Sequence, residues 1–169
     1  ASAKVMNLAH IVQQALAVYG PRCSSAQIEI KAELRSEGQI AIRQGEIMQV
    51  ISNLLANAFY AMSSGGTMSV IVEDTQEPAS GVAIIVGDSG IGIPEDALPR
   101  VFEAFFTTRS TVGTGIGLFV SKNFVETHGG SITIESSTDE DSHGTRVRVF
   151  LPSQTAYSAG LPTSVNPQL

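Results

Sequence analysis

The stretch Gly81–Pro94 reads GVAIIVGDSGIGIP and joins an apolar segment to a glycine-rich loop. The β-branched residues over 81–87 favour a strand in a sheet that is covered on one face. Glycines in the loop 87–94 allow the backbone to approach a flat or charged ligand closely. Asp88 stands at the strand end, where a carboxylate can accept hydrogen bonds from an amino group such as the exocyclic amine of adenine. A tight turn after a strand explains these residues equally well, so this motif alone leaves both interpretations open.

Hydrophobic periodicity on either side of this stretch predicts three helices and six strands. Helices are expected over residues 5–19, 44–63 and about 115–127, and Gly20-Pro21 is expected to end the first. The expected strands are 28–34, 39–43, 67–74, 81–87, 131–137 and 145–151. One helix followed by two strands, three times over, indicates an α/β sandwich. We expect a mixed sheet of about five or six strands with three main helices on one face.

Composition indicates one soluble, acidic domain. The 169 residues include 43% hydrophobic and 15% charged residues, which is enough apolar material for a core. The net charge of −6 argues against a nucleic-acid partner. No apolar run reaches 18 residues, and the single cysteine, Cys23, excludes an internal disulfide. The first ten residues lack the pattern of a signal peptide, so we expect none there. We expect a cytoplasmic, monomeric domain without membrane contact over residues 1–152, followed by a flexible tail or linker over 153–169.

Two asparagines on the long helix form the second candidate motif. Asn53 and Asn57 are four residues apart and therefore share a helix face. Asparagine is a poor helix former, and two solvated polar residues would be the simpler interpretation of this pair alone. The alternative is that a side-chain carbonyl binds a hard cation such as Mg²⁺, which prefers oxygen ligands and keeps waters and substrate phosphates in its shell.

Residues 102–118 contain two further candidate segments. The sequence GTGIGL over Gly113–Leu118 opens the third helix, where backbone N–H groups and the helix dipole favour a phosphate. Its spacing matches neither the dinucleotide fingerprint nor a P-loop. The segment FEAFFTTR over 102–109 could be a satellite of the core. It could also anchor a mobile lid from which Thr107, Thr108 and Arg109 reach phosphates and exclude water.

Taken together, these residues resemble the catalytic, ATP-binding domain of sensor histidine kinases, in the superfamily that also holds gyrase, Hsp90 and MutL. Four boxes occur in order: QVISNLLANAFYAM (49–62) is similar to the N box, DSGIGIP (88–94) to the G1 box, VFEAFFTTR (101–109) to the F box and GTGIGL (113–118) to the G2 box. The sequence GTRVRVFLP (144–152) resembles the closing strand. The resemblance covers about residues 1–152.

The resemblance implies a Bergerat-type fold that holds ATP and Mg²⁺ between the helices and under the lid. It implies that Asn57 binds the metal with the support of Asn53, and that Asp88 takes the adenine amine. The remaining implied nucleotide contacts are Gly90 and Gly92 at the base and sugar, Ile93 against the ring, Thr107, Thr108, Arg109, Gly113, Thr114, Gly115, Gly117 and Leu118 around the phosphates, and Thr145 at the adenine end.

Two positions depart from the pattern of the family. The lid entry usually ends in Lys where this chain has Arg109, and Tyr60 replaces a residue that is basic in many members. Arginine keeps the charge with a different geometry, whereas a phosphate contact from position 60 is in doubt. Gly87–Gly90 (GDSG) also resembles a protease nucleophile segment, but an α/β chain with one cysteine does not fit those all-β, disulfide-rich domains.

Three functions remain open from the sequence. The first is a kinase domain that donates the γ-phosphoryl group of ATP to a histidine on a separate dimerisation domain, and through the parent protein to a response regulator. His10 lacks the Glu and Pro that normally follow an acceptor histidine, so we expect the chain to be part of a larger sensor. The second is a stand-alone ATPase, which would need a Glu where Asn53 stands. The third is a nucleotide-sensing module that never transfers phosphate.

Overall fold

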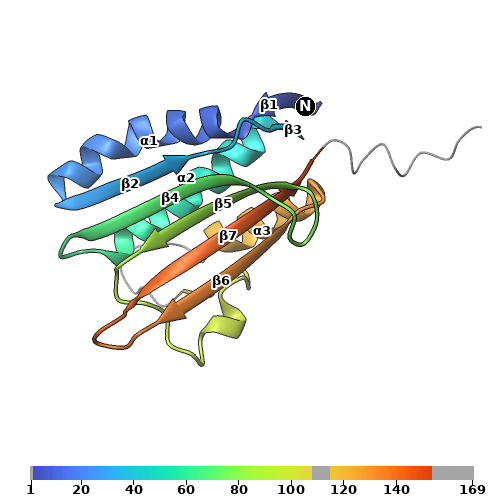
Figure 1. Cartoon of the computed structure of the whole chain (residues 1–169). Coiled ribbons are helices and arrows are strands. Elements are labelled where there is room, and N and C mark those ends of the chain that lie inside the picture. The colour runs from blue at the N-terminus through green and yellow to red at the C-terminus, as the bar shows by residue number, and fades with distance from the viewer. Residues whose placement is uncertain (1, 108–114, 154–169) are drawn as a thin grey trace, which may run out of the picture.

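The computed structural model describes residues 2–107 and 115–153. In this part of the chain three α-helices accompany a twisted sheet. The helices are α1 (Leu8–Ser25), α2 (Gln44–Ala61) and α3 (Gly117–Thr127), and a short 3₁₀ helix spans Leu98–Arg100. Figure 1 shows α1 along the top of the view with α2 and α3 behind the strands. None of the described helices combines the length and apolar character needed to cross a membrane. Most of the expected tail, from residue 154 on, lies outside the described residues.

The main sheet has five strands in the order β2-β4-β5-β7-β6. These strands are β2 (Ile28–Leu34), β4 (Gly66–Thr75), β5 (Gly81–Asp88), β6 (Ser131–Ser137) and β7 (Gly144–Pro152). Strands β2 and β4 are parallel, and the other pairs are antiparallel. The expected mixed sheet with three helices on one face is therefore confirmed. The strand expected at 39–43 is β3 (Gln39–Ile42), which pairs with β1 (Lys4–Asn7) in a separate small sheet.

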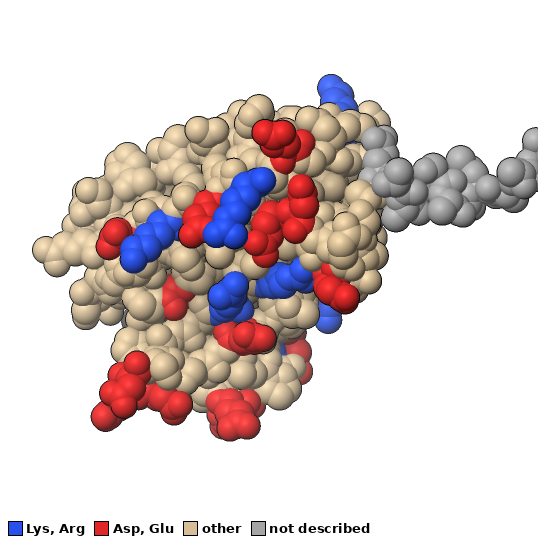
Figure 2. All heavy atoms as spheres, viewed as in Figure 1, with Lys and Arg blue, Asp and Glu red and all other residues tan. Residues whose placement is uncertain are grey.

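Charged side chains collect on the face of the sheet that the helices leave open (Figure 2). On strand β2, Glu29, Lys31 and Glu33 are exposed, and Arg35 just beyond it forms ion pairs with Glu33 and Glu73. Arg148 of β7 donates from Nη2 to the Thr75 hydroxyl at 3.2 Å and to the Glu77 carbonyl oxygen at 2.7 Å. Charged side chains from β2 and β7 therefore cover part of this face, and the opposite face of the sheet packs against the helices.

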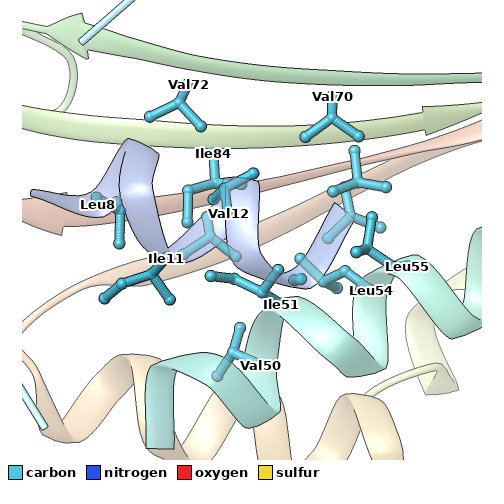
Figure 3. Close-up of a cluster of buried hydrophobic side chains, with 14 of the residues drawn as sticks. Leu8, Ile11, Val12, Val50, Ile51, Leu54, Leu55, Val70, Val72 and Ile84 are labelled. Carbon is cyan, nitrogen blue, oxygen red and sulfur yellow. The ribbon is translucent and has the colours of Figure 1, made fainter. Parts of the chain in front are cut away.

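The core lies between the sheet and the helices. Alternate residues of β4, β5 and β7 point toward the helices, as the period of two requires, and α2 presents its apolar stripe to them. Figure 3 shows side chains from four elements meeting there: Leu8, Ile11 and Val12 of α1, Val50, Ile51, Leu54 and Leu55 of α2, Val70 and Val72 of β4, and Ile84 of β5. Strand β5 is central and is buried on both faces from Gly81 to Gly87. Asp88, at the end of β5, therefore follows a strand that is buried along its length.

The prediction for the first helix was wrong at both ends. Residues 4–7 form β1, and the helix begins at Leu8 because the Asn7 side chain caps it by accepting from the Ala9 N–H at 2.9 Å. The helix then continues through Gly20 and Pro21 to Ser25. Cys23, two residues past Pro21, is fully buried in the core. Pro21 cannot donate the backbone hydrogen bond that a helix normally makes at this position. Burial of the last turn of α1 offsets that loss, so tertiary packing extends the helix past the residues that were expected to end it.

Replacing Gly20 with Ala should stabilise the protein by about 0.5–1 kcal/mol. Gly20 lies inside α1, and a Cβ atom there would meet no other atom within 4 Å. Urea unfolding followed by circular dichroism measures the change. The matched control is Gly130→Ala, where a Cβ would collide with the Phe150 carbonyl oxygen, so that variant should be destabilised. A Gly20→Ala protein less stable than the unaltered chain would mean that the helix does not run through this position.

Candidate functional site

A cavity of about 610 Å³ opens between α2, α3 and the ends of β5 and β7. Its volume lies in the range of small-molecule sites. Much of its floor is apolar and continuous with the core. Twelve of the residues that line it are Gln49, Asn53, Asn57, Tyr60, Asp88, Gly92, Ile93, Thr107, Gly115, Gly117, Leu118 and Thr145.

Asp88 and Thr145 stand side by side at one end of this cavity. They are direct partners in the antiparallel ladder between β5 and β7. Each continues the alternate row of its strand that faces the helices, Val86 before Asp88 and Val147 after Thr145, so both side chains lie on the cavity side of the sheet. Asp88 accepts a hydrogen bond from the Gly90 N–H at 2.9 Å. A carboxylate has about four acceptor positions, so it can accept further bonds from a ligand.

The loop after β5 is shaped by close backbone contacts at its glycines. Gly92 has φ of +77°, and a Cβ atom there would collide with the Ser137 carbonyl oxygen. Gly90 is buried under the end of α2, where a Cβ would collide with the Ala61 carbonyl oxygen. Gly92 and Ile93 therefore line the cavity, whereas Gly90 holds the loop from behind. A ligand contact from Gly90 stays a prediction.

Two residues that the sequence motifs did not indicate hold this loop from the β6–β7 hairpin. The Ile93 N–H donates to the Ser136 hydroxyl at 2.7 Å, and His143 Nδ1 lies 2.5 Å from the Gly90 carbonyl oxygen. The alternation of β6 places Ser136 on the same face as Ile132 and Ile134, which is the side of the core. That alternation was visible in the sequence, but the contact of Ser136 with position 93 depends on the strand register.

Asn53 connects α2 to α3. Its Nδ2 donates to the Gly117 carbonyl oxygen at 3.1 Å and to the Ser121 hydroxyl at 3.2 Å, and its Oδ1 accepts from Gln49 Nε2 at 2.8 Å. Asn57, one turn further along, also lines the cavity. The two asparagines thus share a face as expected, and the contacts of Asn53 are those of a bridge between helices. Metal binding by either residue stays a prediction.

The residues expected around phosphates are only partly described. Thr107, Gly115, Gly117 and Leu118 line the cavity, and Thr108, Arg109, Gly113 and Thr114 lie outside the described residues, as does most of the expected lid. Helix α3 begins at Gly117 beside the cavity and has no side-chain cap there. The N–H groups of such a helix start favour an anion.

The charge around the cavity is sparse. Asp88 carries the only charge among the described residues that line it. At the rim, Arg22 of α1 donates to the Tyr60 hydroxyl at 3.3 Å, and this bond raises the pKa of the Arg22 guanidinium. The guanidinium also lies over the rings of Tyr19 and Phe59, at 5.5 and 4.9 Å from their centroids. A positive charge from another helix therefore stands behind Tyr60, although position 60 itself is not basic.

The described part of the site offers few ligands for a magnesium ion. In residues 2–107 and 115–153 no group of three His, Cys, Asp or Glu side chains could hold a metal ion. Asn57 offers an amide oxygen, a hard donor of the kind Mg²⁺ accepts. Because Mg²⁺ keeps several waters and readily takes phosphate oxygens, one amide ligand is compatible with a metal that arrives with a phosphorylated ligand.

Comparison with known proteins places these features in a family context. Residues 42–155 match the family model described as histidine kinase-, DNA gyrase B- and HSP90-like ATPase. The sensor protein FixL of Bradyrhizobium diazoefficiens is 32% identical over 151 residues, which are 88% of this chain and 29% of FixL. The sensor histidine kinase ZraS of Salmonella typhimurium is 33% identical over 150 residues, which are 88% of this chain and 31% of ZraS. The chain spans less than a third of these relatives.

A solved structure shows the same architecture. The catalytic domain of the histidine kinase ThkA, in a nucleotide-free form, superimposes with a TM-score of 0.79 at 26% identity. The match covers 90% of this chain and 97% of that one. The layered arrangement of helices and sheet is therefore shared over almost the whole of that domain.

Replacing Asn53 with Ala should destabilise the protein by about 1–3 kcal/mol. The change removes both bonds from Nδ2 and leaves the hydroxyl of Ser121, a fully buried residue, without that donor. Urea unfolding provides the measurement. Asn123→Ala is the matched control, because Asn123 is an exposed residue of α3. If Asn53→Ala were as stable as this control, the bridge between α2 and α3 would have no energetic weight.

Proposed function

The chain belongs to the histidine kinase-, DNA gyrase B- and HSP90-like ATPase family, and on this premise we propose that it binds ATP with Mg²⁺ and donates the γ-phosphoryl group to a histidine of a separate dimerisation domain. The observation that carries the proposal is the pairing of Asp88 with Thr145 at one end of the cavity. This pair places a carboxylate and a hydroxyl next to the apolar floor of the cavity. The floor would hold a flat ring, and the pair would bind its polar edge.

The two ends of the cavity suit the two ends of a nucleotide. The Asp88 carboxylate can accept from an exocyclic amine, and Ile93 offers an apolar surface to the base. At the other end, the uncapped start of α3 and Thr107 offer donors suited to phosphate. We propose that Asn57 binds a magnesium ion that arrives with the phosphates. That ion would supply charge stabilisation for phosphoryl transfer.

The role of Asn53 favours transfer over hydrolysis. Water activation needs a group that accepts a proton, and an amide does so poorly at neutral pH. The nitrogen of Asn53 donates to the Gly117 carbonyl oxygen and to the Ser121 hydroxyl, and an ionised carboxylate at this position could not donate to the carbonyl. Asp88 is the single carboxylate among the described lining residues, and we assign it to the adenine ring of ATP. The site is therefore better suited to positioning a phosphoryl donor than to activating water.

The acceptor and the later partners belong to the wider protein. A histidine ring nitrogen would form the new bond to the γ-phosphorus while the bond to the β-phosphate oxygen breaks and ADP leaves. We propose that this histidine lies on a dimerisation domain of the same parent protein and that a response regulator receives the phosphoryl group next. The curated relatives named sensor proteins or sensor histidine kinases, each more than three times the length of the matched segment, support this arrangement.

Replacing Asp88 with Asn should weaken ATP binding about 10- to 150-fold, because one acceptor position becomes a donor that faces the donor amine. Isothermal titration with Mg²⁺-ATP measures the affinity. Asp96→Asn makes the same change of charge at an exposed position in the following loop, and it should bind as the unaltered chain does. If Asp88→Asn and Asp96→Asn bound ATP with equal affinity, Asp88 would not be a contact of the nucleotide.

Replacing Asn57 with Ala should lower phosphorylation of the acceptor by about two orders of magnitude or more, since a bound cation contributes several kcal/mol to the transition state. The assay supplies γ-labelled ATP, Mg²⁺ and the histidine-bearing dimerisation domain of the parent in trans. Asn123→Ala serves again as the control. The unaltered chain should label that domain and release phosphate slowly on its own, whereas rapid release without labelling would favour a stand-alone ATPase.

A further inference from the structure

Three polar side chains form a row across the sheet at the end of the cavity. Asp88 of β5 pairs with Thr145 of β7, and Thr145 pairs with Ser136 of β6. Asp88 and Thr145 line the cavity, and Ser136 lies behind them with three hydrogen-bond partners. These partners are the Ile93 N–H at 2.7 Å, the Gly144 carbonyl oxygen at 2.9 Å and the Thr145 hydroxyl at 2.7 Å.

The three partners of Ser136 determine the direction of every hydrogen bond in this cluster. A serine hydroxyl has one hydrogen to donate and two acceptor positions. The Gly144 carbonyl oxygen can only accept, so it takes the Ser136 hydrogen, and the Ile93 N–H can only donate. The remaining acceptor position of Ser136 must therefore be filled by the Thr145 hydroxyl, which donates its hydrogen away from the cavity.

We propose that Ser136 is a positioning residue that makes Thr145 a hydrogen-bond acceptor toward the ligand and thereby favours a 6-amino purine over a 6-oxo purine. This inference rests on the proposed function. With its hydrogen held by Ser136, Thr145 presents only lone pairs to the cavity, next to the acceptor oxygens of Asp88. An exocyclic amine finds two acceptors there, whereas a carbonyl oxygen would face the lone pairs of both.

The same hairpin keeps the loop in place for this arrangement. His143 Nδ1 lies 2.5 Å from the Gly90 carbonyl oxygen, and Gly92 packs directly on the Ser137 carbonyl. The loop is thus held against the hairpin at two positions just before Ile93, Gly90 and Gly92. The Ile93 N–H therefore keeps one acceptor position of Ser136 occupied, and the direction of the Thr145 hydroxyl does not depend on a mobile partner.

The test compares ATP with ITP, whose base carries a carbonyl at the 6-position, as ligands of the full 169-residue chain with Mg²⁺ by isothermal titration. Ser136→Ala should lower the ratio of ATP to ITP affinity about three- to ten-fold, because the Thr145 hydroxyl can then turn and donate to a carbonyl. Ser136→Thr keeps a hydroxyl and should restore the ratio. Ser131→Ala makes the same change at the other end of β6, about 17 Å away along the strand, and should leave the ratio as it is.

The outcomes separate this inference from the proposed function. Absence of ATP binding by the unaltered chain would overturn both. Binding of ATP with an unchanged ratio in folded Ser136→Ala, or a Ser136→Thr protein that behaves like Ser136→Ala, would overturn the role of Ser136 alone. If Ser136→Ala does not fold, Thr145→Val decides the matter, because it deletes the hydroxyl whose direction is in question. An unchanged ratio in that variant would also overturn the inference.

Discussion

The two-residue period of the sheet is the constraint on which both the core and the site depend. Along β5 and β7 it directs one row of side chains to the helices, and that row is apolar until the strands reach their ends at the cavity. There the same rows continue as Asp88 and Thr145. The polar end of the cavity is therefore an extension of the core and takes its geometry from the packing of valine and isoleucine. A shift of one residue in register would turn Asp88 to the open face and put Gly87 or Ser89 in its place, depending on the direction of the shift.

Helix α2 serves the core and the cavity at once because its period differs from that of the strands. Its apolar stripe fills the space over β4 and β5, and the adjacent face carries Asn53 and Asn57. Asn53 joins α2 to α3 through Gly117 and Ser121, so the start of α3 is held in place beside the cavity. A Cβ at position 117 would lie 3.7 Å from Asn53 Cγ, an ordinary contact distance, so the approach of the two helices does not depend on the glycine. The Asn53 side chain thus connects α2, which carries Asn57, to the start of α3.

The sequence was sufficient where local pattern and tertiary environment agree. Residues 131–137 and the central strand ending at Asp88 were predicted almost to the residue, because their periodicity is matched by burial in the structure. Pro21 misled the prediction because the gain from burying Cys23 comes from contacts that are distant in sequence. The bridge from Asn53 spans 64 and 68 residues, and the contact of Ser136 with Ile93 spans 43. Such contacts depend on helix crossing and strand register, which composition and spacing do not specify.

The order of the strands leaves β2 and β6 at the two edges of the main sheet. An edge strand exposes unpaired backbone groups and can recruit a strand from another molecule. Here β2 carries Glu29, Lys31 and Glu33 in alternation, and β6 carries an exposed Glu135. A second copy that docked strand to strand would have to bring these charged side chains into the new contact, which makes growth of the sheet from chain to chain unfavourable. The domain can therefore exist at high local concentration, as in a protein that holds two copies close together, without fusing its sheets.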